Sequence, residues 1–136
     1  MDTGAWLAGF HRRDQYHAPA LALFRELRER RSELVVTDLV LAELHAHLVR
    51  AVGPVSAAGF LETTKSNALV REVYADEELQ QAAFADWLLR FDDQPFTFTD
   101  AVSFAVMRAR GIGTAFTFDR HFAVAGFDVW PPAGGG

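Results

Sequence analysis

The chain has 136 residues, of which 50% are hydrophobic and 23% charged, a composition typical of one globular domain rather than a disordered segment. It contains no cysteine, which excludes disulfides, thiolate zinc sites, iron–sulfur clusters and cysteine nucleophiles. The formal net charge of -5 argues against a nucleic-acid binder driven by overall charge. No apolar run approaches the roughly 20 residues of a membrane span, and no signal-peptide pattern follows Met1. We therefore expect a cytoplasmic protein that makes no membrane contact.

Helices and short apolar strands alternate along the sequence. The patterns predict helices over 18–31, 38–52, 55–66, 76–91 and 101–110, and strands over 34–36, 68–70, 115–118 and 127–130. No hairpin signal separates any two strands, so the connections should cross over and the strands should run mainly parallel. The sequence therefore predicts an α/β fold, a three-layer α/β/α sandwich with a short, mainly parallel central sheet. We expect residues 1–130 to form one domain and the PPAGGG segment at 131–136 to form a flexible tail.

Two of these helices begin at residues that favour helix starts. Thr37 is placed to cap the helix at 38–52, and Thr99 and Asp100 are placed to cap the helix at 101–110. Such caps mark the residues at which a strand or loop ends and a helix begins. Polar side chains at these residues lie near the ends of the strands.

Three acidic residues fall at such junctions. Asp2 precedes a first short helix, Asp100 starts the helix at 101–110, and Asp119 follows the strand at 115–118. In an open parallel sheet, ligands bind beyond the carboxyl ends of the strands. Carboxylates that converge there repel one another unless they are hydrated, protonated or hold a cation. Oxygen ligands favour a hard cation such as Mg²⁺ or Mn²⁺.

Each acid also has a purely structural interpretation. Asp100 could be only a helix cap, Asp119 only a turn residue and Asp2 only part of a terminus. Glu43 lies on the helix at 38–52, roughly 140° from its leucine stripe, so periodicity alone directs it toward solvent. Taken singly, none of the four acids identifies a function.

Four segments along the chain resemble a PIN domain, the ribonuclease fold of bacterial VapC-type toxins. They are DTGAWLA at 2–8, TDLVLAEL at 37–44, FTFTDAVSFAVM at 96–107 and TAFTFDRHF at 114–122, and the resemblance runs from residue 2 to about residue 130. It implies that Asp2, Glu43, Asp100 and Asp119 form one acidic site. In such enzymes these acids hold one or two divalent ions, Mg²⁺ or alternatively Mn²⁺, and direct a water onto an RNA phosphodiester. The resemblance also implies that Glu43 points toward the other acids, whereas the periodicity of its helix directs it toward solvent.

One departure from the family concerns its first acid, which normally ends an apolar strand of several residues. Only Met1 precedes Asp2 here, so the first strand is truncated in this sequence. Either the start site is assigned too late, or the chain has lost the strand. A true loss would leave Asp2 unanchored and the neighbouring backbone unpaired.

The resemblance predicts a metal-dependent endoribonuclease, the toxin half of a type II toxin–antitoxin pair. It further implies a homodimer and a cognate antitoxin that covers the acidic cleft with an arginine-bearing segment. Two alternatives stay open at this point. One is a catalytically inactive PIN-like binding module whose acids are only caps. The other is a PIN nuclease that processes RNA outside any toxin–antitoxin pair.

The remaining polar residues are weaker candidates. His45 and His47 stand two positions apart on a helix and so do not face each other, which argues against a metal-binding pair. His121 follows closely on one acid, and a packing role for it is as reasonable as a contact with the acids or with RNA. Thr117 and Ser103 lie near two of the acids, where they could hydrogen-bond a carboxylate or a phosphate.

Overall fold

The structure, a computed structural model, describes residues 1–10 and 17–130, and the tail expected at 131–136 lies outside them. Helices and strands alternate in chain order: α1 Thr3–Phe10, α2 His17–Glu29, β1 Leu34–Thr37, α3 Asp38–Val52, α4 Pro54–Ser66, β2 Val70–Val73, α5 Glu77–Ala82, the wider π-helical turns η1 Ala83–Leu89, α6 Phe98–Arg110, β3 Thr114–Phe116, α7 His121–Val124 and β4 Asp128–Trp130. The predicted α/β class is confirmed, with all strands short.

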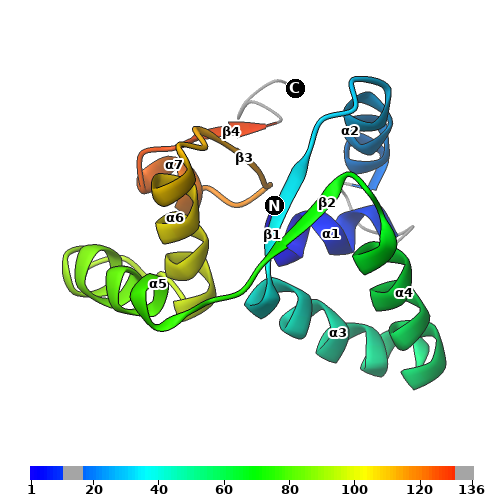
Figure 1. Ribbon diagram of the computed structural model, residues 1–136, viewed down its shortest axis with the longest axis horizontal. Coiled ribbons are helices and arrows are strands. Elements are labelled where there is room, and N and C mark those ends of the chain that lie inside the picture. The colour runs from blue at the N-terminus through cyan, green and yellow to red at the C-terminus, as the bar shows by residue number, and fades with distance from the viewer. Residues whose placement is uncertain (11–16, 131–136) are drawn as a thin grey trace.

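The four strands form two parallel pairs. β1 pairs with β2 and β3 pairs with β4, and among the described residues no ladder joins one pair to the other. Figure 1 shows α1–α4 with the β1–β2 pair on one side of the N-terminus, and α5–α7 with the β3–β4 pair on the other. The sheet predicted as one short central layer is thus divided in two, with the first residues of the chain between the halves.

The core of the second half is built around α6. Its residues 101–107 are all buried, because the helix is enclosed by α5, η1, α7 and β1. Phe104 is fully buried, and its ring packs against the aromatic rings of Trp87, Phe96, Phe122 and Phe127. Edge-to-face and tilted ring contacts of this kind stabilise a core beyond the area that they bury. This packing fixes the axis of α6 and therefore the position of its first turn.

The core of the first half lies between α3 and its neighbours. Val40, Leu44 and Leu48 are buried at helical spacing on the face of α3 that meets α1 and α4. At the end of α3, Gly53 adopts a φ of 88°, a conformation that side-chain-bearing residues rarely take, and Pro54 starts α4 directly after it. The sharp turn between the two helices lets them pack side by side.

Thr37 joins β1 to α3. Its side chain is buried, and its Oγ1 accepts the backbone N–H of Val40 over 3.2 Å, as a helix N-cap does. The cap predicted from the sequence is therefore confirmed. Because the residue ends a strand and begins a helix, it sets the angle at which α3 leaves β1.

We expect Thr37→Ala to lower the free energy of unfolding by about 1 kcal/mol, because the N–H of Val40 loses its acceptor. Urea unfolding followed by circular dichroism measures the change. Thr37→Ser is the matched control, since serine retains the hydroxyl and should remain close to the wild-type value. An alanine variant as stable as the serine variant would contradict the capping role.

Candidate active site

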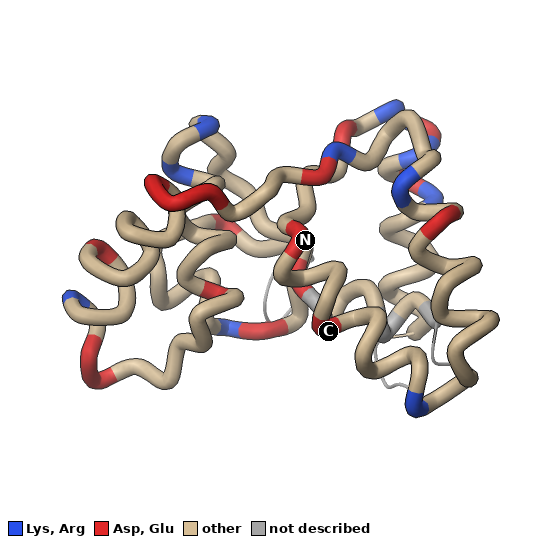
Figure 2. The backbone as a smooth tube through the Cα atoms, turned by 60° about the horizontal axis from the view of Figure 1, so that its bottom comes forward, with Lys and Arg blue, Asp and Glu red and all other residues tan. Residues whose placement is uncertain are grey.

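Four acidic side chains from four parts of the chain line one open cavity of about 700 Å³. Asp2 precedes α1, Glu43 lies within α3, Asp100 stands in the first turn of α6, and Asp119 follows β3. The rest of the lining consists of neighbours of these residues: Gly4, Val40, Thr97, Thr99, Ser103, Phe118, Arg120 and His121. In Figure 2, acidic segments lie around the N-terminus in the middle of the molecule. All four acids singled out in the sequence thus face one cavity.

Thr117, at the end of β3, connects two of the acids. Its buried hydroxyl donates to Asp2 Oδ2 over 2.5 Å, and the same oxygen accepts the backbone N–H of Asp119 over 2.9 Å. Asp2 Oδ1 accepts the N–H of Ala5 over 2.9 Å, so Asp2 also caps α1. Both carboxylate oxygens of Asp2 are therefore held in place by neighbours.

The environment of Asp2 favours its protonated form. Burial raises the pKa of the Asp2 carboxyl above its usual range, and the nearby Asp119 carboxylate adds to this rise. The hydrogen bonds from Thr117 and Ala5 and the positive amine of Met1 act in the opposite direction on this pKa. Burial in turn lowers the pKa of the Met1 amine, against the attraction of the Asp2 charge. The chain therefore starts with a buried amine beside a buried carboxyl.

Asp100 is held by a reciprocal pair of hydrogen bonds with Thr97. The N–H of Asp100 donates to Thr97 Oγ1 over 3.0 Å, and Asp100 Oδ2 accepts the N–H of Thr97 over 3.2 Å. This capping box corrects the prediction that Thr99 and Asp100 precede the helix, because α6 already begins at Phe98 and Asp100 lies inside its first turn. Asp100 is therefore fixed at the cavity wall by the start of the helix itself.

Glu43 meets both of the conflicting expectations drawn from the sequence. It is exposed, as the periodicity of its helix predicts, and it lines the same cavity as the other acids, as the resemblance implies. Thr99 on α6 donates its hydroxyl to Glu43 Oε1 over 2.7 Å. This bond directs Glu43 toward α6 even though the leucine face of its own helix points elsewhere.

His121 lies between two of the acids. Its Nδ1 is 3.2 Å from Asp119 Oδ2 and 3.5 Å from Asp100 Oδ2, although neither contact has the alignment of a hydrogen bond. The backbone N–H of His121 donates to Asp119 Oδ1 over 2.9 Å, and its ring packs edge-on against Phe96. An N–H at Nδ1 would thus face the carboxylate oxygens of both acids.

The donor set fits a hard divalent cation. The four acids supply carboxylate oxygens, the ligands that Mg²⁺ and Mn²⁺ prefer in proteins. Among the residues that the structure describes, however, no three Asp, Glu or His side chains are grouped tightly enough to coordinate one ion together. Coordination of one ion by three of these carboxylates would require them to lie closer together than they do here, whereas Mg²⁺ also binds through one or two carboxylates with water as its other ligands.

Thr99 and Arg120 have contacts or positions in the cavity that the sequence does not predict. The sequence suggests only a capping role for Thr99, and its contact with Glu43 joins two helices that are distant in sequence, so no local pattern could reveal it. Arg120 is exposed at the cavity wall, and the signal that could have identified it is its position directly after Asp119. Neither member of the His45 and His47 pair is among the residues that line the cavity.

The raised pKa of Asp2 predicts how the stability of the Asp2→Asn variant depends on pH. The folded protein binds the proton of the Asp2 carboxyl more tightly than the unfolded chain does. The stability that this proton contributes is therefore fully present at pH values below the pKa that Asp2 has in the unfolded chain. It is lost as the pH rises through the folded pKa. Asn cannot ionise and caps a helix about as well as Asp. We therefore expect the variant to gain stability over wild type as the pH rises from about 4 and passes through the folded pKa of Asp2.

Urea unfolding at several pH values across this range measures the difference for Asp2→Asn. Asp92→Asn, a change at an exposed loop acid, is the control and should track the wild type. A difference between Asp2→Asn and wild type that stays constant with pH would show that the buried carboxyl does not titrate as its environment indicates.

Comparison with known proteins identifies the family. A family model described as the PIN domain matches residues 1–128. The chain is 33% identical over 127 residues to the 23S rRNA-specific endonuclease VapC20 of Mycobacterium tuberculosis, from strains CDC 1551 / Oshkosh and ATCC 25618 / H37Rv, with 93% of each chain covered. The crystal structure of VapC20, described as a sarcin-ricin loop cleaving toxin, matches with a TM-score of 0.78 and 31% identity, again over 93% of each chain. The chain therefore belongs to the PIN-domain family and, within it, to the VapC-type ribonuclease toxins.

Proposed function

We propose that this chain is a Mg²⁺-dependent endoribonuclease, with Mn²⁺ as the alternative ion, that cleaves ribosomal RNA. The observation that carries the proposal is the convergence of Asp2, Glu43, Asp100 and Asp119 from four separate elements on one cavity. Converging carboxylates are costly to fold unless a cation or protons compensate their charge. RNA phosphates carry the same sign of charge, so the cavity needs a cation before it can accept a phosphodiester.

Each acid has a role in this proposal. Asp2, Asp100 and Asp119 hold the ion, and Glu43 completes the acidic cluster and orients the attacking water through its carboxylate. Such an ion, when bound, activates water and neutralises charge on the phosphodiester. Thr117 supports this arrangement because its hydroxyl fixes the orientation of the Asp2 carboxylate relative to Asp119.

Ribosomal RNA is the proposed substrate because the relatives described above act on it. These relatives are described as 23S rRNA-specific endonucleases, and they share a third of their residues with this chain over nearly its whole length. The exposed Arg120 at the cavity wall is positioned to contact an RNA phosphate. Exposed arginines on α2, Arg25 and Arg28, offer further backbone contacts. Action on ribosomal RNA would take place in the cytoplasm.

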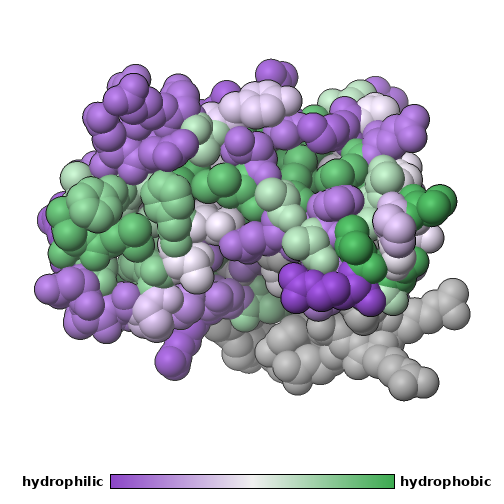
Figure 3. All heavy atoms as spheres, turned by 90° about the horizontal axis from the view of Figure 1, so that it is seen from below, coloured by the Kyte–Doolittle hydropathy of each residue, from purple (hydrophilic) through white to green (hydrophobic). Residues whose placement is uncertain are grey.

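An antitoxin and a second copy of the chain are the proposed protein partners. An arginine-bearing antitoxin segment suits a cavity lined by four carboxylates, because guanidinium groups pair with carboxylates in a bidentate geometry. Apolar side chains also reach the surface, among them Val55 at the start of α4 and Phe84 and Leu89 on η1. Seen from below (Figure 3), hydrophobic atoms come to the surface among hydrophilic ones at both ends of the molecule. Such surfaces permit a homodimer.

None of the described helices is long and apolar enough to cross a membrane.

Asp100→Asn separates the catalytic role of Asp100 from its capping role. Asn still accepts the N–H of Thr97, so the free energy of unfolding should stay within about 0.5 kcal/mol of wild type. Removal of the charge should lower cleavage of ribosomal RNA by about 100-fold or more. Single-turnover cleavage measured by primer extension, together with urea unfolding, tests both halves of the prediction.

Asp93→Asn is the matched control, since Asp93 is an exposed loop acid and its loss should leave cleavage intact. Retained cleavage in Asp100→Asn would reduce Asp100 to a helix cap. If the wild type itself fails to cleave, the inactive binding module becomes the correct interpretation. Cleavage confined to RNA precursors would instead support the processing nuclease.

Metal binding makes a separate prediction that does not depend on a substrate. An ion that binds only the folded protein raises the melting temperature, so millimolar MgCl₂ or MnCl₂ should stabilise the wild type relative to EDTA. Asp119→Asn should lose most of this stabilisation, while the control Asp128→Asn, at an exposed acid outside the cavity, should keep it. Scanning fluorimetry measures the shift. Equal shifts in the two variants would place the ion elsewhere.

A further inference from the structure

The hydroxyl of Thr99 joins the two halves of the molecule at the acidic cavity. Thr99 is the second residue of α6, and its hydrogen bond of 2.7 Å ends on Glu43 Oε1 in α3, which belongs to the other half. The two residues lie 56 positions apart in the sequence, and both line the acidic cavity. The bond therefore relates the position of one acid to the helix that carries another, Asp100.

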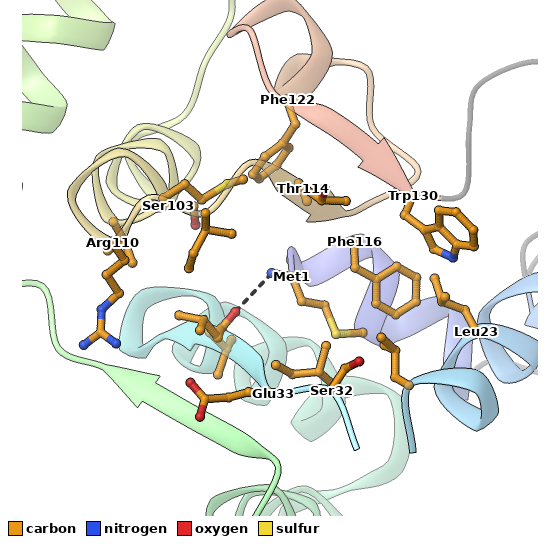
Figure 4. A pocket seen from close by; sticks show the side chains of 18 of the residues that line it. Met1, Leu23, Ser32, Glu33, Ser103, Arg110, Thr114, Phe116, Phe122 and Trp130 are labelled. Carbon is orange, nitrogen blue, oxygen red and sulfur yellow. Dashed lines mark hydrogen bonds between the residues drawn. The ribbon is translucent and has the colours of Figure 1, made fainter. Parts of the chain in front are cut away.

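The two halves are not closely packed on the side of the strands. A second cavity, of about 650 Å³, lies there, with β1 on one side and β3 on the other. In Figure 4, Ser103 and Phe122 lie on the side of the second half, and Ser32 and Glu33 lie on the side of the first. Ser103 lines both this cavity and the acidic cavity, so the open space adjoins the acids. Polar contacts between the halves therefore matter for how the acids lie relative to one another.

Glu43 differs from the other three acids in how it is held. Asp2, Asp100 and Asp119 each accept a backbone N–H from a residue two or three positions away. Glu43 stands in the middle of α3, where the backbone N–H groups are used within the helix. Its long side chain is exposed and loses rotamer freedom when it stays in one place. Its orientation therefore depends on side-chain contacts, and the Thr99 hydroxyl supplies one of them.

Electrostatic repulsion opposes the position of Glu43 in the cavity. Carboxylates that share a cavity repel one another, which favours rotation of an exposed glutamate toward solvent. A hydroxyl that donates to a carboxylate makes a charge-assisted hydrogen bond, roughly twice as strong as a bond between neutral groups. Thr99 also lies in the first turn of α6, where the helix dipole is positive. Both effects hold the Glu43 carboxylate in the cavity.

Thr97, two positions before Thr99, shows that the two hydroxyls have different roles. Oγ1 of Thr97 accepts the N–H of Asp100 and so caps the start of α6. The single hydroxyl proton of Thr99 goes instead to a side chain on another helix. Within a helix threonine is less favourable than alanine, because its branched Cβ restricts the side chain. The hydroxyl of Thr99 thus serves Glu43 rather than the stability of α6.

We propose that Thr99 is a positioning residue of the ribonuclease, whose hydroxyl holds Glu43 in the orientation from which its carboxylate directs water onto the phosphodiester. This inference rests on the function proposed above, in which Glu43 orients the attacking water. A carboxylate has about four acceptor positions, and the bond from Thr99 uses one of them, so the group can still accept hydrogen bonds from a water. Thr99 itself contacts neither that water nor the RNA. Loss of its hydroxyl should therefore slow cleavage without weakening RNA binding.

The test compares Thr99→Val, which removes the hydroxyl and keeps the branched shape, with Thr99→Ser, which keeps the hydroxyl. Single-turnover cleavage of ribosomal RNA at saturating MgCl₂ gives the maximal rate constant and the protein concentration at half-maximal rate. Thr99→Val should lower the rate constant by about 10- to 100-fold, because a displacement of about 1 Å at a reacting group costs up to that much. The half-maximal concentration should not change. Thr99→Ser should restore the wild-type rate constant.

Thr63→Val is the matched control, since Thr63 is exposed on α4 and lies outside the acidic cavity. It should cleave as the wild type does, and all three variants should melt within about 2 °C of wild type. A wild-type rate constant in Thr99→Val would overturn the proposal, and so would a Thr99→Ser variant as slow as Thr99→Val. A raised half-maximal concentration at an unchanged rate constant would also overturn it, because Thr99 would then act in RNA binding.

A double-mutant cycle tests whether Thr99 acts through Glu43. Glu43→Gln alone should lower the rate constant by about 100-fold or more. Addition of Thr99→Val to Glu43→Gln should cause no further loss, because the carboxylate that Thr99 positions is already gone. The same loss from Thr99→Val in both backgrounds would show that Thr99 acts independently of Glu43 and would overturn the proposal.

A measurement without RNA separates this inference from the proposed function. In NMR spectra of the full chain, the carboxylate ¹³C resonance of Glu43 should shift in Thr99→Val and stay in place in Thr63→Val. An unmoved resonance in Thr99→Val would overturn the placement of Glu43 by Thr99. If the wild type cleaves no RNA while this resonance shifts, the proposed function fails and the placement of Glu43 by Thr99 is supported.

Discussion

The buried hydroxyl of Thr117 is the contact on which the arrangement of the acidic cavity depends. One oxygen donates to the carboxylate of Asp2 and accepts the amide of Asp119, so the end of β3 orders two acids that come from opposite ends of the chain. The same bond opposes the rise in the pKa of Asp2 that burial causes. Without that hydroxyl, a carboxyl in this position would have to remain protonated or turn toward solvent.

Local features of the fold were predictable from the sequence, while features that depend on distant contacts were not. Thr37 caps α3 as predicted, because a cap depends only on residues three positions apart. The strand expected at 68–70 lies instead at Val70–Val73, since the side chain of Asn67 accepts the N–H of Leu69 and forms a turn there. Apolar composition does not distinguish such a turn from a strand.

Some residues of the candidate site were predictable from the sequence, and others were not. Asp100 and Asp119 were predictable because they lie where a helix begins or a strand ends, and such boundaries can be recognised in the sequence. The orientation of Glu43 toward the cavity was not predictable from its own helix. Helical periodicity identifies only the core face of α3, and the hydroxyl that binds Glu43 belongs to Thr99 on α6. His121 lies between two carboxylates only because α6 and the end of β3 come together in space.

The capping roles of the acids affect how related sequences can be read. Asp2 and Asp100 satisfy backbone amides at the starts of two helices, so selection for folding alone would retain them in a descendant that had lost its chemistry. Glu43 stands in the middle of α3, where it caps no helix start. Among homologous chains, its replacement is therefore the sharper marker of a lost nuclease, and the persistence of Asp2 and Asp100 is weak evidence that activity survives.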